Sequence, residues 1–64
     1  MNTPLSMLAA HKAGIAFWRM NRPVDATREA LTFHARTCGW KTAAEIEAWL
    51  AGYYGEKRRM EAGQ

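Results

Sequence analysis

The chain has 64 residues, of which 48% are hydrophobic and 23% are charged. This length allows one small domain and excludes a nucleotide-binding βαβ pair or an enclosed substrate cavity. The hydrophobic fraction is too high for a disordered chain, so we expect a globular protein. Nine Lys and Arg against six Asp and Glu give a net charge of +3, which permits an acidic partner without requiring one.

The single cysteine, Cys38, cannot form an internal disulfide, which excludes a disulfide-stapled secreted miniprotein. The N-terminus lacks the basic start and unbroken apolar run of a signal peptide. The apolar stretch Gly14–Trp18 is far shorter than the ~20 residues of a membrane-spanning helix. We therefore expect a soluble, cytoplasmic protein with no membrane partner.

The first predicted helix covers residues 4–20. Thr3 is a suitable N-cap, and Pro4 suits the first helical position because its φ is already fixed. Pro23 disfavours helical geometry at the residue before it and so ends this helix. Apolar and aromatic side chains recur at spacings of three and four residues, which predicts a buried stripe: Leu8, His11, Ile15 and Trp18.

The second predicted helix covers residues 23–38. Pro23 is expected to open it, with Asp25 in the first turn interacting favourably with the helix dipole. Gly39 is expected to end it, because glycine accepts a positive φ without steric cost. The predicted buried stripe is Val24, Thr27, Leu31, His34 and Cys38, widened by Ala30 and Ala35.

The third predicted helix covers residues 42–54. Thr42 and Glu45 have the spacing of a capping box, in which each side chain satisfies a free backbone N–H group. Gly52 and Gly55 weaken the far end, so residues 55–64 either continue the helix or fray into a tail. No stretch alternates with period two, so we predict an all-α, three-helix unit that forms a single domain over residues 1–64. Its buried stripe is Ile46, Trp49, Leu50 and Tyr53.

His34, Cys38 and His11 are the candidates for metal binding and for nucleophilic catalysis. His34 and Cys38 are four residues apart on one helix face, but a structural zinc site needs four ligands and His11 is the one further candidate. The same thiol and imidazoles lack a glycine-rich oxyanion turn, and the chain is too short to enclose a substrate. We therefore predict no metal, no cofactor and no enzymatic activity, with Cys38 as an inert buried thiol.

A DNA-binding hypothesis rests on the second and third helices. Ala35, three further residues and Gly39 are followed by the apolar Trp40, and on this pattern residues 30–50 resemble the helix-turn-helix family. That family has a branched apolar residue six positions after the glycine, where this chain has Glu45, and Ile46 follows one residue late. An αα-hairpin used only for packing is the alternative interpretation. The resemblance would place near base edges Lys41, Thr42, Ala43, Ala44 and Glu47.

Basic side chains also gather near the C-terminus, at Lys57, Arg58 and Arg59. Together with Lys41 they are candidates for contacts with phosphates or with an acidic surface. Glu56 and Glu61 flank the run, so a solvated helix end is the alternative interpretation.

The surplus of large side chains is the most informative feature. Aromatic residues, Met and Arg are enriched at protein interfaces, and self-association lets a short chain bury what one copy cannot. We therefore predict a homodimer and a protein partner, although several of these residues could instead complete the core. The residues left over after the three stripes are Met7, Phe17, Met20, Phe33, Trp40, Tyr54 and Met60. The predicted contact residues are Phe17, Arg19, Arg22, Phe33, Arg36, Trp40 and Tyr54.

The whole chain resembles the short helical accessory proteins of temperate bacteriophages, a group that includes anti-CRISPR and anti-quorum-sensing proteins. The resemblance rests on size and on Ala-, Arg- and Trp-rich helical stretches such as 28–36 and 39–50. It implies a protein that binds a host factor and inhibits or modulates it by occlusion. A small helix-turn-helix transcriptional regulator is the alternative.

Overall fold

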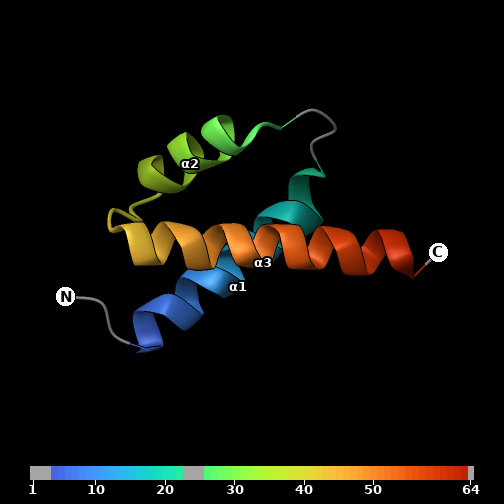
Figure 1. The fold of residues 1–64 in the computed structure, drawn as a ribbon, viewed down its shortest axis with the longest axis horizontal. Helices are drawn as coiled ribbons and strands as arrows, with labels where there is room; N and C mark the ends of the chain where they lie inside the picture. Colours follow the sequence, from blue (N-terminus) through green and yellow to red (C-terminus); the bar gives the residue numbers. More distant parts are fainter. Residues whose placement is uncertain (1–3, 23–25, 64) are drawn as a thin grey trace.

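The computed structural model describes residues 4–22 and 26–63, which form three helices joined by loops (Figure 1). α1 spans Pro4–Asn21, α2 spans Arg28–Thr37 and α3 spans Ala43–Ala62. No strand occurs among these residues, which confirms the predicted all-α, three-helix fold.

α1 and α3 cross with their backbones in contact. A Cβ atom added to Gly14 would lie 1.9 Å from the carbonyl oxygen of Trp49, and one added to Gly52 would lie 2.0 Å from the carbonyl oxygen of His11. Each glycine therefore makes room for the backbone of the opposite helix, which a residue with a side chain could not do. Ala10 lies one turn before Gly14 and is fully buried, so small residues fill the crossing.

This close crossing corrects the predicted buried stripe of the first helix. Leu8 and Ile15 were expected in the core, but Leu8 is 49% exposed and Ile15 is half-buried. The face of α1 that meets α3 must carry its smallest residues, so the helix is rotated and these larger side chains lie towards solvent. Trp18, beyond the crossing point, is buried as predicted.

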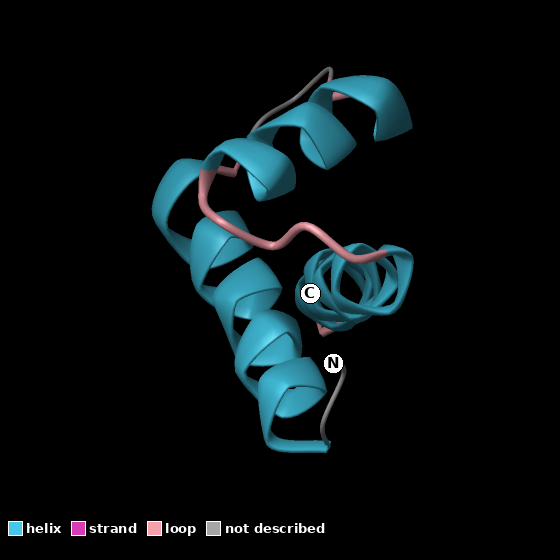
Figure 2. Ribbon diagram, turned by 90° about the vertical axis from the view of Figure 1, so that its left-hand side faces the viewer, coloured by secondary structure: helices cyan, strands magenta, loops and turns pink. Residues whose placement is uncertain are grey.

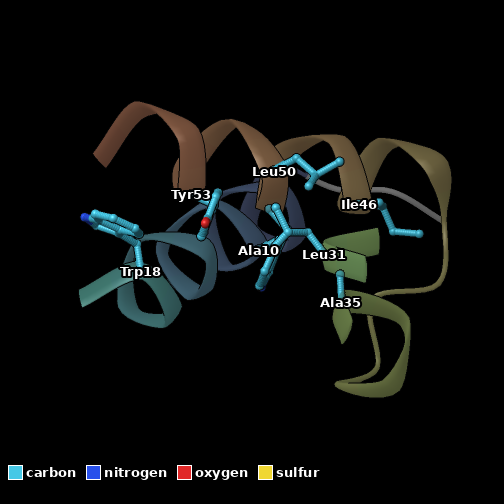
Figure 3. Close-up of a cluster of buried hydrophobic side chains, with 8 residues drawn as sticks. Ala10, Trp18, Leu31, Ala35, Ile46, Leu50 and Tyr53 are labelled. Carbon is cyan, nitrogen blue, oxygen red and sulfur yellow. The ribbon is translucent and has the colours of Figure 1, made fainter. Parts of the chain in front are cut away.

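The core lies along the inner side of α3, where α1 and α2 both pack (Figure 3). Trp49 and Tyr53 are stacked with nearly parallel rings, and the edge of Trp18 meets Tyr53 at a centroid distance of 5.6 Å. The buried hydrophobic residues are Ala10, Trp18, Leu31, Ala35, Ile46, Trp49, Leu50 and Tyr53.

α2 begins later than the sequence predicts. The expected start at Pro23 lies outside the described residues, whereas Ala26 and Thr27 are described and are not helical. Thr27 is the N-cap because its hydroxyl accepts a hydrogen bond from the backbone N–H of Ala30 at 3.1 Å. This local cap fixes the first turn of α2 at Arg28.

α2 ends at a Schellman motif centred on Gly39. The backbone N–H of Trp40 donates to the carbonyl of Ala35 at 3.1 Å, and the N–H of Gly39 donates to that of Arg36 at 3.0 Å. Gly39 has φ +112°, as its predicted role as a helix stop requires. Cys38, expected in the core, is exposed because it belongs to this turn.

α3 is longer than the sequence predicts. The capping box at its start is present, with the Glu45 N–H donating to the Thr42 hydroxyl at 3.2 Å. The helix then continues through Gly55 to Ala62, so the structure has the first of the two alternatives for this segment, a continued helix. Tertiary contacts explain the extension, because Glu56 is buried against two arginines and Met60 packs on the core.

α2 is the peripheral helix. Most of the contacts between helices join α1 to α3, and α2 lies across another side of α3, which is seen nearly end-on in Figure 2. Leu31 and Ala35 are the buried residues of α2. Its link to α1 is a ring contact between Phe17 and His34, with centroids 4.4 Å apart.

Candidate protein-binding surfaces

Phe17 was predicted as a contact residue, and the structure gives it a packing role. Its ring lies 4.4 Å from that of His34, 5.2 Å from that of Trp49 and 6.0 Å from that of Tyr53, measured between centroids. These contacts join α1, α2 and α3 at one point. Phe17 is therefore part of the interior that holds the helices together.

The side chains of Trp40 and Tyr54 also pack in part against the core. Both are half-buried against the core, and Tyr54 meets Tyr53 edge to face with a centroid distance of 5.0 Å. Arg22 is exposed just beyond the end of α1, where its φ of 41° and its N–H bond to the Trp18 carbonyl terminate the helix. Of the seven predicted residues, Phe17, Trp40 and Tyr54 are thus partly covered by packing, and Arg22 is exposed at the end of α1.

Two predicted residues do meet, on the outward side of α2. Phe33 is 73% exposed, and Arg36 lies less than one turn further along the same face. A surface hollow opens here, and we name its lining residues the α2 outer face: Arg28, Glu29, Thr32, Phe33 and Arg36. Arg28 is held at one side by an ion pair with Glu47 of α3.

A second hollow lies on α1 and includes residues that the sequence analysis did not select as contacts. Met20, at its edge, is 83% exposed and is the most exposed large hydrophobic residue described. Helix α1 contains no acidic residue, so this surface is apolar and basic. We name its lining residues the α1 outer face: Lys12, Ile15, Ala16, Arg19 and Met20.

Arg19 is fixed in place by a buried carboxylate. Its Nε donates to Glu56 Oε2 at 2.6 Å, and Arg59 donates to both oxygens of the same carboxylate at 3.0 and 2.9 Å. The two arginines, Arg59 first, lower the pKa of Glu56 from 4.5 to about 2. The group therefore stays ionised, and one carboxylate between two guanidinium groups leaves one positive charge at this edge of the α1 outer face.

Of the four residues predicted to contact phosphates, two interact with other side chains of the chain and two are exposed. Arg59 is engaged by Glu56, and the ammonium of Lys57 lies 5.9 Å from the centroid of the Trp18 ring. Arg58 is exposed near the C-terminal end of α3, and Lys41 is exposed in the loop before α3 begins. These four cations do not form one phosphate-binding cluster.

His34 and Cys38 approach each other, with Cys38 Sγ 3.4 Å from His34 Nε2. Within the described part of the chain, no three His, Cys, Asp or Glu side chains gather closely enough to hold a metal ion. His34 lies in the last turn of α2, half-buried against Phe17, whereas Cys38 is exposed in the turn that follows.

Comparison of the chain with family models, with curated proteins and with solved structures gave no match. In residues 4–22 and 26–63, none of the helices combines the length and the hydropathy that a bilayer-spanning segment needs.

Proposed function

We propose that this chain is a non-enzymatic protein that binds another protein through the α1 outer face and thereby inhibits or modulates it. The observation that carries the proposal is Met20, a flexible apolar side chain that is 83% exposed beside two basic residues. Methionine adapts its shape to apolar partners and is enriched at protein interfaces.

The charges of this face indicate the chemistry of the partner. Lys12 and Arg19 line the hollow, and α1 supplies no carboxylate to neutralise them. Glu56 accepts a hydrogen bond from the Nε of Arg19 and holds this guanidinium in place. The terminal nitrogens of Arg19 can therefore donate to a carboxylate of a partner. A segment with an apolar side chain for the hollow and acidic side chains beside it complements this surface.

The resemblance to phage accessory proteins supports a bacterial host factor as the partner and inhibition as the outcome. Occlusion of the partner's own binding surface needs no catalytic group, which agrees with a chain of this size. The cytoplasm is then the place of action.

The test is a tagged pull-down from nuclease-treated bacterial lysate with two matched variants. Ala16 and Ala51 are both exposed helical alanines, the first inside the α1 outer face and the second on α3. We expect one stoichiometric protein with the wild type and with Ala51→Glu, and its loss with Ala16→Glu, because a carboxylate in the hollow repels an acidic segment. Equal capture by both variants, or capture of nothing stoichiometric, would contradict the proposal.

DNA binding is the second candidate, and two features of the turn after α2 favour it. Ala35 is fully buried and Gly39 has a positive φ, as a helix-turn-helix needs at these positions. The first turns of α3, however, carry Glu45 and Glu47 where a phosphate-lined groove requires positive charge. Nuclease sensitivity of the captured material, with a steep loss of binding as salt rises, would favour this second function.

A further inference from the structure

The α2 outer face carries a self-complementary arrangement of charges around an exposed aromatic ring. Glu29, Phe33 and Arg36 follow at intervals of four and three residues, so they lie along one side of the helix. Phe33 is 73% exposed, and neither Glu29 nor Arg36 forms an ion pair with any described residue. A negative charge thus lies on one side of the ring and a positive charge on the other.

When the helix is turned to run in the opposite direction, the order becomes positive charge, ring, negative charge, which is complementary to the original order. When two copies of α2 are placed antiparallel, with a twofold axis passing between Thr32 and Phe33, Glu29 of each copy faces Arg36 of the other. Both ion pairs form at once, because in a twofold interface every contact occurs twice. The two Phe33 rings meet at the centre, where aromatic side chains contribute most to binding.

The hollow on α2 gives the ring a place to enter. Arg28, Glu29, Thr32 and Arg36 line it together with Phe33 itself. The phenyl ring of a second copy can pack between Thr32 and the aliphatic part of Arg36 while its own Arg36 reaches back to Glu29. The intramolecular pair between Arg28 and Glu47 keeps Arg28 turned to α3, away from competition for Glu29.

We infer that the α2 outer face is the interface between two copies of this chain, joined antiparallel by a central Phe33 contact and two reciprocal Glu29–Arg36 ion pairs. The charges select a second copy as the occupant, because those of Glu29 and Arg36 sum to zero and repeat in reverse, while the charge of Arg28 is already paired with Glu47. The α1 outer face has the opposite property: it carries Lys12 and Arg19 with no acid on α1, so two such faces repel each other.

The inference is independent of the proposed function, since the two surfaces lie on different helices. If both hold, one dimer presents two α1 outer faces and can engage two copies of a partner, or one partner with two sites. Such bivalent binding is tighter than that of either face alone when both sites can be reached together.

The test is a charge-reversal mixing experiment followed by sedimentation equilibrium. In a dimer of Glu29→Arg, the introduced guanidinium of each copy would face Arg36 of the other, and in a dimer of Arg36→Glu the introduced carboxylate would face Glu29. Each variant alone is expected to dimerise at least about tenfold more weakly than the wild type, because like charges then face each other twice. An equimolar mixture is expected to recover the dimer to within about threefold of the wild type, because both contacts become attractive again.

Circular dichroism shows whether each variant is folded, and recovery in the mixture cannot arise from unfolded chains. Phe33→Ser, at an exposed position, is expected to abolish the dimer while leaving the helical signal intact. Met20→Ser on α1 is the matched control and should leave the dimer unchanged.

Three outcomes would overturn the inference: a wild type that stays monomeric at about 1 mM, where even weak specific pairs associate; a mixture no more dimeric than its separate variants; or a dimer that Met20→Ser disrupts and Phe33→Ser does not. None of these outcomes affects the pull-down test, which depends on the α1 outer face and on Ala16→Glu. Failure of the dimer and failure of the proposed function are therefore distinguishable.

Discussion

Gly14 shows how much one missing side chain determines in this molecule. Its Cβ would lie 1.9 Å from the Trp49 carbonyl oxygen, and the obstructing atoms belong to the backbone, which cannot rotate away. Gly14→Ala is therefore expected to force α1 and α3 apart and to lower the free energy of unfolding by about 1–3 kcal/mol, as overpacking in a rigid core does. Urea denaturation followed by circular dichroism measures this change.

Gly55 provides the matched control for that substitution. It lies in α3, and a Cβ atom there would meet nothing within 4 Å. Gly55→Ala is expected to raise the free energy of unfolding by about 0.5–1 kcal/mol, through helix propensity alone. If both substitutions changed the free energy of unfolding in the same direction, Gly14 would not be needed for the close crossing of α1 and α3.

Glu56 makes the stability of the fold depend on pH. Its pKa in the folded protein is about 2, whereas the unfolded chain has the ordinary value of 4.5. Stability from its two ion pairs is therefore fully present above about pH 5, and it is lost as the pH falls from there to about 2, because the unfolded state binds the proton first. We expect the free energy of unfolding to decline over this range, and Glu56→Gln to remove a large part of that decline.

Glu45 contributes with the same sign, since its hydrogen bond from Ser6 and its place in the capping box lower its pKa as well. The decline is thus reduced, but not abolished, in Glu56→Gln. Glu61→Gln replaces an exposed carboxyl and serves as the comparison. A Glu56→Gln protein with the full pH dependence of the Glu61→Gln protein would show that the buried carboxylate is not the titrating group.

At the scale of the element, the start of α3 depends on one threonine. Thr42→Ala removes the acceptor of the Glu45 N–H bond and one half of the capping box, so we expect a loss of about 1 kcal/mol in the free energy of unfolding. Thr32→Ala, in the middle of α2, is expected to gain about 0.5 kcal/mol from helix propensity when both substitutions are made in the Phe33→Ser background, where Thr32 has no dimer contact. Thermal denaturation of both variants decides between a role for the cap and a general effect of losing threonine.

Helix ends were predictable from the sequence where the signal is local. The capping box at Thr42 and the positive φ of Gly39 depend on neighbouring residues, and the structure shows both. The start of α2 was missed because Pro23 offered a second local signal besides Thr27. The sequence did not decide between a continued helix and a frayed tail after Gly55, because Glu56 stabilises the end of α3 through Arg19, which is distant in sequence.

The candidate surfaces were predictable in part, for a related reason. Phe33 and Arg36 were identified because aromatic residues and Arg are enriched at protein interfaces and neither lies on a predicted buried stripe. Met20 was counted as surplus but not chosen, because its exposure depends on the rotation of α1. That rotation follows from the small residues at the crossing with α3, and the partner of Gly14 cannot be read from α1 alone.

At the scale of the whole molecule, the three helices are not equally secured. α1 and α3 share the close crossing and most of the contacts, whereas α2 buries Leu31 and Ala35 and touches α1 through one ring contact. We expect amide hydrogen exchange in α2 to be at least about tenfold faster than around Gly14 and Gly52, because α2 can open without separating the other pair. The measurement belongs in the Phe33→Ser background, where a dimer cannot protect α2. Equal protection of all three helices would show a single cooperative unit.

The order of the helices along the chain has a consequence for biosynthesis. The two helices that cross most closely, α1 and α3, are separated by all of α2, so α1 is synthesised well before its partner. At ~5–20 residues per second, about two to eight seconds pass between the synthesis of the end of α1 and that of the end of α3. The docking of α1 on α3 therefore cannot begin until α3 has been made, and we expect it to be the step that limits the rate of folding.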